Sequence, residues 1–116
     1  PKDKQITIDL VLSIDEINDV LYRTIMRFAP FGLGNEAPVF CTNEINNFKL
    51  SLVGNNNSHL KGIVIGKSKS FEFIGFNLGH KYDDLCKSNA IDICYTIYED
   101  SWRGEKKLKL KLIDIK

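Results

Sequence analysis

The segment 29–40 restricts the fold of this chain more than any other, because it separates a helical pattern from a series of strand patterns. Pro30 disfavours helical dihedral angles at the residue before it, and Gly32 and Gly34 permit positive φ. Pro38 fits only the beginning of a strand. We therefore expect a connector of fixed shape between a helix and a sheet.

Upstream of this connector the sequence predicts a short strand and then a helix. Alternating apolar residues indicate a strand over Gln5–Val11. Ser13-Ile14-Asp15-Glu16 has the form of a capping box, and apolar residues then recur at helical spacing, which predicts a helix from about Ile14 to Phe28. The apolar positions of that helix are Ile17, Val20, Leu21, Ile25 and Phe28. We expect Phe31 and Phe40 in the connector to pin this helix against the sheet.

Downstream of the connector the chain reads as five strands. They are Val39–Val53 with a bend at Asn46 and Asn47, His59–Gly66, Phe71–Asn77, Ala90–Glu99 and Lys106–Ile115. The intervening segments are turns at Gly54–Ser58 and Lys67–Ser70, a short helix at Gly79–Lys87, and a loop at Asp100–Gly104. A helix between the third and fourth of five strands is the order of the OB-fold, a partly open Greek-key barrel. We predict a mainly β protein, with an N-terminal strand, helix and connector at 1–37 and an OB-fold at 38–116.

Composition limits the function classes. The chain has 116 residues, of which 43% are hydrophobic and 27% charged, as in one ordinary globular domain. Its net charge of +1 provides no general basic field. Affinity for nucleic acid would therefore depend on where individual lysines and arginines lie.

Cysteine usage and hydropathy point to a soluble, cytoplasmic protein. Cys41, Cys86 and Cys94 are odd in number and lack C-x-x-C spacing, which favours reduced thiols over disulfides or a zinc site. No apolar run reaches the roughly 18 residues of a membrane helix. The chain also begins Pro1-Lys2-Asp3 without an initiator methionine, as an excised fragment would.

An OB-fold binds ligands along its second and third strands and the two loops beside them. On the second strand Leu60 and Val64 are expected to face the core, which leaves His59 and Lys61 on the outer surface. A lysine there can meet phosphates, and a histidine can stack on a base or donate to it. The alternative is that both are simply solvated strand residues.

Three further groups of residues are candidates for a nucleic-acid interface. Trp102 can stack on a base with Arg103 beside it, or can pack on the N-terminal helix. Phe76 is a stacking candidate on the third strand, where alternation does not decide whether it or Phe71 and Phe73 face the core. The alternating lysines Lys107, Lys109 and Lys111 can track phosphates or protect an edge strand.

No catalytic or metal site is evident in the sequence. His80, Asp83 and Asp84 have metal-compatible spacing, but nothing supplies further ligands. No serine, cysteine or paired-carboxylate arrangement suits catalysis, which argues against an autonomous hydrolase. We expect no cofactor in this chain.

Several motifs in order resemble the C-terminal OB-fold of the RecJ family. The first is Pro30-Phe31-Gly32-x-Gly34-Asn35-x-x-Pro38-Val39-Phe40. It is followed by His59-Leu60-Lys61, by Ile74-Gly75-Phe76-Asn77-Leu78-Gly79, and by Trp102-x-Gly104 before a strand that ends Ile113-Asp114-Ile115. The resemblance covers nearly the whole chain, with Glu36, Gly62 and Gly75 as departures from the usual pattern.

The resemblance implies a parent enzyme that removes nucleotides from the 5′ end of single-stranded DNA in recombination and repair. Its Mn²⁺ or Mg²⁺ would be held by DHH-type motifs upstream of residue 1. This domain would then bind single-stranded DNA and position it for the catalytic domains, without hydrolysing it. The alternative is an interaction module that docks on those domains or on a partner protein through the helix and connector.

Overall fold

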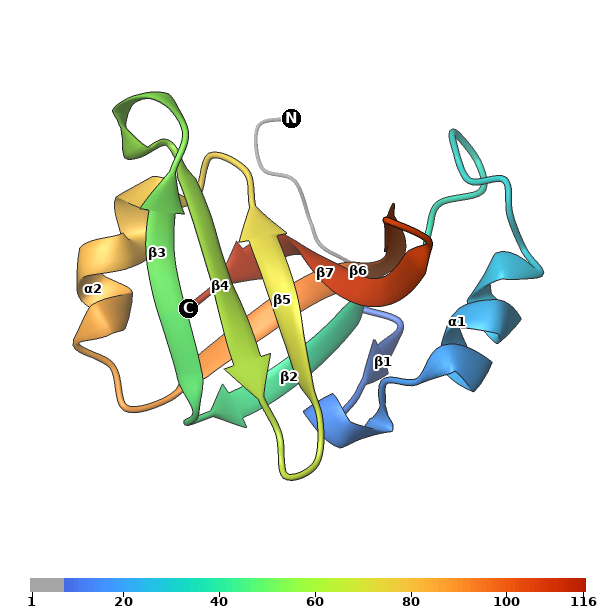
Figure 1. Cartoon of the computed structure of the whole chain (residues 1–116), viewed down its shortest axis with the longest axis horizontal. Coiled ribbons are helices and arrows are strands. Elements are labelled where there is room, and N and C mark those ends of the chain that lie inside the picture. Colours follow the sequence, from blue (N-terminus) through green and yellow to red (C-terminus); the bar gives the residue numbers. More distant parts are fainter. Residues whose placement is uncertain (1–7) are drawn as a thin grey trace.

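The computed structural model describes residues 8–116 as one curled β-sheet with two short helices outside it (Figure 1). The strands are β1 (Leu10–Val11), β2 (Phe40–Ile45), β3 (Phe48–Val53), β4 (His59–Ile65), β5 (Ser70–Gly75), β6 (Ile91–Trp102) and β7 (Glu105–Ile115). The α-helices are α1 (Asp19–Met26) and α2 (Tyr82–Cys86), and 3₁₀ turns lie at η1 (Ile14–Glu16), η2 (Asn55–Asn57) and η3 (Gly79–Lys81).

All seven strands belong to a single open sheet in the order β1-β2-β6-β7-β5-β4-β3. The architecture is mainly β and OB-fold-like, but the prediction of a five-stranded barrel is wrong in its strand count. The first predicted strand is two strands, β2 and β3, and β1 adds another at the edge. Counted along the observed strands, α2 therefore lies between the fifth and the sixth rather than between the third and the fourth.

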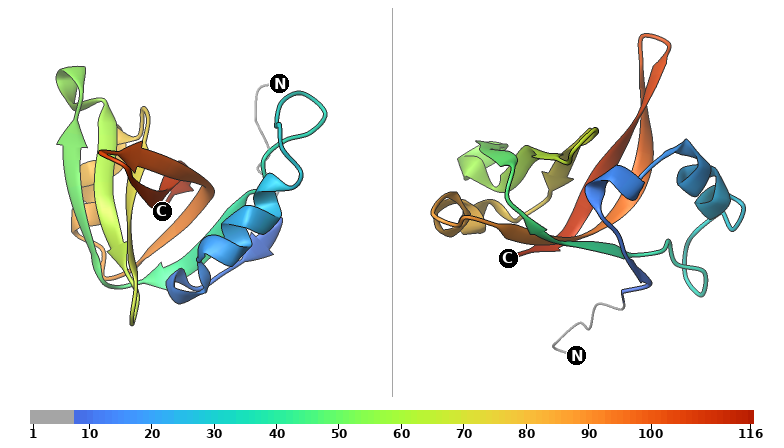
Figure 2. Two further views of the ribbon diagram at one scale, coloured as in Figure 1. Left: turned by 45° about the vertical axis from the view of Figure 1, so that its right-hand side comes forward. Right: turned by 90° about the horizontal axis from the view of Figure 1, so that it is seen from below.

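The curl of the sheet arises at the bend between β2 and β3. The pairing of β2 with β6 shifts register between Thr42 and Ile45, and Glu44 within this bulge has a φ of 55°. The Asp92 carboxylate on β6 accepts a hydrogen bond of 2.8 Å from the Glu44 amide, which fixes the bulge. Because β2 and β3 are consecutive in the chain but lie at distant places in the sheet, the bend wraps the sheet around its core (Figure 2).

The inner face of the curled sheet forms the hydrophobic core. The side chains of Leu60 and Val64 on β4, Phe73 on β5 and Leu110 on β7 are at most 1% exposed. The predicted core face of β4 is thereby confirmed. Deep in the core the Tyr95 and Thr42 hydroxyls share a 2.8 Å hydrogen bond, and burial raises the pKa of Tyr95 to about 12.

The predicted N-terminal strand and helix are shorter than the sequence indicated. Only β1 is a strand within the described part of this segment, and the positions 5–7 lie outside the described residues. The helix is interrupted because Ile17 is extended and fully buried, with φ −78° and ψ 121°. The Asn18 side chain then caps α1 by accepting a 2.8 Å hydrogen bond from the Leu21 amide.

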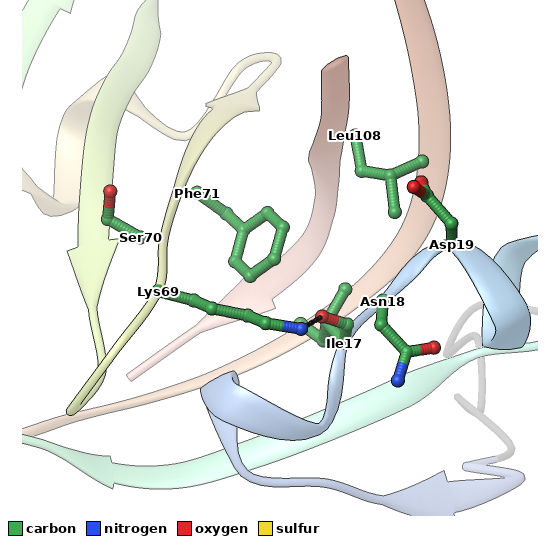
Figure 3. Close-up of a pocket in the computed structure, with 7 residues that line it drawn as sticks. All are labelled: Ile17, Asn18, Asp19, Lys69, Ser70, Phe71 and Leu108. Atoms are coloured by element: carbon green, nitrogen blue, oxygen red, sulfur yellow. Dashed lines mark hydrogen bonds between the residues drawn. The ribbon is translucent and has the colours of Figure 1, made fainter. Parts of the chain in front are cut away.

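Polar contacts attach η1 to the turn between β4 and β5. The Asp15 carboxylate accepts hydrogen bonds of 2.8–3.0 Å from the backbone amides of Lys67, Ser68 and Lys69. The Lys69 ammonium donates a 2.9 Å hydrogen bond to the Ile17 carbonyl, beside an open pocket of about 340 Å³ (Figure 3). These contacts hold the start of the N-terminal segment against the sheet.

The connector has the fixed shape that its sequence predicts. The Asn35 side-chain amide donates to the carbonyls of Phe28 and Pro30, at 2.8 and 2.7 Å. Gly34 has a φ of 79°, in the region that favours glycine. Phe40 is buried and Phe31 packs against the core, so both apolar residues of the connector contact the interior, which is compatible with the predicted pinning of the helix to the sheet.

Replacing Asp15 by Asn should lower the melting temperature near neutral pH, because a charged acceptor is lost from three amides. Those hydrogen bonds lower the pKa of Asp15 below its ordinary value of 3.8. The stabilisation is therefore complete above pH 3.8 and disappears as the pH falls through the still lower folded-state pKa. Thermal unfolding of wild type and Asp15→Asn across this range measures the difference. Glu99→Gln, at an exposed strand position, is the control and should show no such loss.

Replacing Gly62 by Ala should destabilise the fold by about 1–3 kcal/mol, because the site has no room for a methyl group. A Cβ there would overlap the Lys49 carbonyl and lie 2.7 Å from the Phe73 ring. Urea unfolding measures the effect. Gly32→Ala is the matched control, since its Cβ would meet nothing within 4 Å; equal losses in both variants would contradict the close packing.

Candidate nucleic-acid interface

The outer face of β4, β5 and β7 carries most of the residues that the sequence singled out. Register pairs Lys61 on β4 with Ile74 on β5, and Ile74 with Lys111 on β7, so these three side chains form one row. Phe73 and Gly75 are buried, so Phe76 takes the outer side of β5. The choice between the two faces of β5, which alternation left open, is thus made by the structure.

His59 begins β4 at the edge of this face. Its Nδ1 accepts a 2.9 Å hydrogen bond from the Asn77 amide, so that nitrogen carries no proton in this arrangement. Its ring meets Phe76 edge to face, with ring centroids 5.3 Å apart. These contacts hold both aromatic rings in place.

Phe76 combines exposure with a nearby cation. The side chain is 52% exposed, and the Lys111 ammonium lies 5.8 Å from the ring centroid. Lys61 is exposed two strands away from Lys111, which corresponds to about 10 Å. We call His59, Lys61, Ile74, Phe76 and Lys111 the Phe76 surface.

Lys109 is committed to ion pairs. Its ammonium lies 2.8 Å from the Asp100 carboxylate and 3.3 Å from that of Glu72. The bond to Asp100 raises the pKa of Lys109, and the same bond lowers the pKa of Asp100. The charge of Lys109 is therefore balanced by two carboxylates before any ligand arrives.

Lys107 borders a groove of about 400 Å³ beyond these ion pairs. The groove is lined by Glu72, Asp100, Trp102, Glu105, Lys107 and Lys109. Lys107 is exposed and pairs in register with Asp100. This end of the outer face is mixed in charge, whereas Lys61 and Lys111 have no carboxylate partner within 4 Å among the described residues.

Trp102 and Arg103 lie at the tip of the β6–β7 hairpin. The loop expected at Asp100–Gly104 is instead a continuation of β6 through Trp102, closed by a turn at Arg103 and Gly104 with φ of 52° and 80°. Both values suit the tight hairpin turn that matches strand twist. Trp102 is 67% exposed with the Arg103 guanidinium 4.4 Å from its ring centroid, so of the two alternatives for this residue, packing on the N-terminal helix is wrong.

Of the three alternating lysines, Lys111 is the one that lies beside Phe76. Its alternation with Lys107 and Lys109 signalled exposure, but its position beside Phe76 results from the parallel pairing of β5 with β7. At Lys111, β7 lies between two other strands, so edge protection does not explain this lysine.

The remaining candidate chemistry is structural in character. The Cys41 and Cys94 thiols lie 3.7 Å apart on paired strands, and burial raises the pKa of Cys94 to about 11. Over residues 8–116 there is no group of three or more His, Cys, Asp or Glu side chains able to hold a metal ion. Nor does any helix in this part of the chain have the length and apolar character needed to cross a membrane.

A curled sheet with aromatic and cationic residues on one outer face defines an OB-fold-like domain with a candidate nucleic-acid interface. A family model described as the RecJ OB domain matches residues 8–114. The chain therefore belongs to the RecJ OB domain family.

Solved structures agree with this fold. The crystal structure of RecJ in complex with Mn²⁺ from Thermus thermophilus superposes with a TM-score of 0.60 at 19% sequence identity, covering 83% of this chain and 13% of that one. The Mg²⁺ complex of RecJ from the same organism gives a TM-score of 0.60 and 19% identity, with 82% and 14% covered. No curated protein sequence matches the chain. The chain thus corresponds to a small part of the RecJ chains that share its fold.

Proposed function

We propose that the Phe76 surface binds single-stranded DNA on behalf of a RecJ-type 5′→3′ exonuclease that acts in recombination and repair. The observation that supports this most directly is that the exposed ring of Phe76 lies beside the ammonium group of Lys111. Base stacking on an aromatic ring and phosphate contacts from lysines are the two interactions that hold single strands without sequence preference.

The distribution of charge favours the Phe76 surface over the groove beside Trp102 and Lys107 as the primary binding site. Lys61 and Lys111 face solvent, whereas Lys109 is neutralised by Glu72 and Asp100. A phosphate approaching Lys109 would have to displace a carboxylate. The single strand therefore crosses β4, β5 and β7 near Phe76, where no such competition occurs among the described residues.

The role of the domain is positioning rather than catalysis. The family relationship suggests catalytic domains elsewhere that hold Mn²⁺ or Mg²⁺, and the described residues do not suit such an ion. Stacking on Phe76 would fix the bases, and the two lysines would fix the backbone. The strand would then lead toward the separate catalytic site.

Replacing Phe76 by Ala should weaken binding of a labelled oligothymidine by about 1–3 kcal/mol, since one base loses its stacking platform. Lys61→Ala or Lys111→Ala should each reduce the slope of log affinity against log salt by about 0.7, the value for one phosphate contact. Fluorescence anisotropy at several salt concentrations measures both effects.

The controls are an exposed phenylalanine and an exposed lysine elsewhere. Phe28→Ala, at 67% exposure near the end of α1, and Lys87→Ala, after α2, should leave affinity and salt slope unchanged. Absence of binding by the wild type, or equal losses in the controls, would contradict the proposed function.

A second candidate function is docking on other domains, and the distribution of exposed apolar side chains favours it. Among the described residues, seven of the ten large hydrophobic side chains that are exposed lie in the N-terminal segment: Ile8, Leu10, Val11, Val20, Met26, Phe28 and Leu33. Exposed apolar side chains in such numbers are typical of an interface. Under this proposal the segment 1–37 joins the sheet to the catalytic domains of the parent chain.

Replacing Phe28 by Ser should weaken association with the separately expressed catalytic region of such a parent by about tenfold, as for one apolar hot-spot residue. Calorimetric titration measures the affinity. Phe76→Ser is the matched control for this surface and should leave the association intact, so a loss with Phe76→Ser alone would place the contact on the outer face instead.

A further inference from the structure

The last part of β6 and the first part of β7 form a two-stranded ribbon that projects from the sheet. Beyond Tyr95, β6 pairs only with β7, and before Leu110, β7 pairs only with β6. The ribbon extends away from the remaining strands, as the right-hand view of Figure 2 shows. Its tight turn at Arg103 and Gly104 presents the tip in a defined orientation.

The tip of this ribbon, residues 101–107, has an aromatic and cationic character of its own. It contains three cations, Arg103, Lys106 and Lys107, and one carboxylate, Glu105, and Asp100 lies opposite Lys107 on the neighbouring strand. Trp102 is 67% exposed and lies outside the hydrophobic core, with Arg103 over its ring. An exposed indole with a cation beside it is a combination that can stack on a base and meet a phosphate.

We propose that this tip binds the double-stranded DNA next to the single strand, so that the preferred ligand is a junction between duplex and single-stranded DNA. This inference rests on the proposed function of the Phe76 surface. Trp102 stacks on the last base pair of the duplex, and the three cations contact its phosphates.

The separation between the two surfaces supports a single ligand that spans both. Trp102 pairs with Glu105, and Lys111 lies six residues further along β7, a distance of about 20 Å. A stacked strand advances about 3.4 Å per nucleotide, so about six nucleotides bridge the two surfaces. The ion pairs of Lys109 with Glu72 and Asp100 lie between them, one cation with two carboxylates, so the bridging nucleotides have no phosphate contact there.

Chemistry favours nucleic acid over a protein partner at this tip. The exposed side chains of residues 101–107 are one indole and charged groups, three of them cations, whereas most exposed aliphatic residues of the described chain lie in the N-terminal segment. A protein-docking surface would more naturally use the latter. The tip instead repeats, at the other end of the outer face, the pairing of an aromatic ring with cations found at Phe76.

The test compares affinities of the 116-residue chain for three labelled DNAs: a single strand, a duplex carrying the same strand as a tail, and the blunt duplex. With a tail of at least about six nucleotides, the tailed duplex should bind about tenfold more tightly than the free strand. Tails on the 5′ and 3′ ends are measured separately, and a tail of half that length should show no gain. Trp102→Ala should abolish the preference without changing affinity for the free strand.

The controls separate this inference from the proposed function. Phe28→Ala should retain the junction preference, and because Trp102 lies outside the core, Trp102→Ala should unfold at the wild-type temperature. Equal affinity of wild type for the free strand and the tailed duplex, or a preference that survives Trp102→Ala, would overturn the inference while leaving the Phe76 surface in place. If Phe76→Ala and Lys61→Ala both bind the free strand as tightly as wild type, the proposed function is overturned instead.

Discussion

The bend between β2 and β3 is the constraint on which the rest of this structure depends. It places two consecutive strands at distant positions of one sheet, and so curls the sheet around Leu60, Val64, Phe73 and Leu110. Since side chains alternate along every strand, fixing one face as core fixes the other as surface. The Phe76 surface is therefore a direct consequence of the curl. Its members point outward because their neighbours in sequence are required inside.

Electrostatics then divides the outer face into two ends. The ion pairs of Lys109 with Glu72 and Asp100 join β5, β6 and β7 across the face, and they remove one cation from the row of lysines. On either side of this cluster a cation lies near an aromatic ring, Lys111 near Phe76 and Arg103 near Trp102. Position along β7 thus decides whether a lysine of this face is free of carboxylate partners among the described residues, as Lys111 is, or held in ion pairs, as Lys109 is.

The N-terminal segment is attached differently from the strands of the sheet. Near its start it is held by the pairing of β1 with β2, by buried side chains such as Ile17, and by the hydrogen bonds of Asp15 to the β4–β5 turn. At its other end the Asn35 side chain fixes the shape of the connector from within. Between them, α1 buries Ile25 but exposes Val20, and Phe28 just beyond its end is exposed as well. The segment thus has fixed ends and an incompletely covered apolar middle, which is consistent with its proposed role between the sheet and other domains.

Much of the secondary structure could be predicted from the sequence, because it depends on local residue chemistry. Turn residues and alternation predicted the strands β4 and β5, most of β6 and β7, and the bend at Asn46 and Asn47, although β2 and β3 were taken as one strand. They also predicted the short helix before β6 and the core face of β4, because these features depend on neighbours in the chain. The start of α1 was missed, since the Asn18 cap and the burial of Ile17 both depend on packing against the sheet. Only the tertiary structure decided which face of β5 is inner, that Lys109 is ion-paired and that Lys111 lies beside Phe76. These facts follow from register between strands distant in sequence, and alternation within one strand carries no information about the strand that will pair with it.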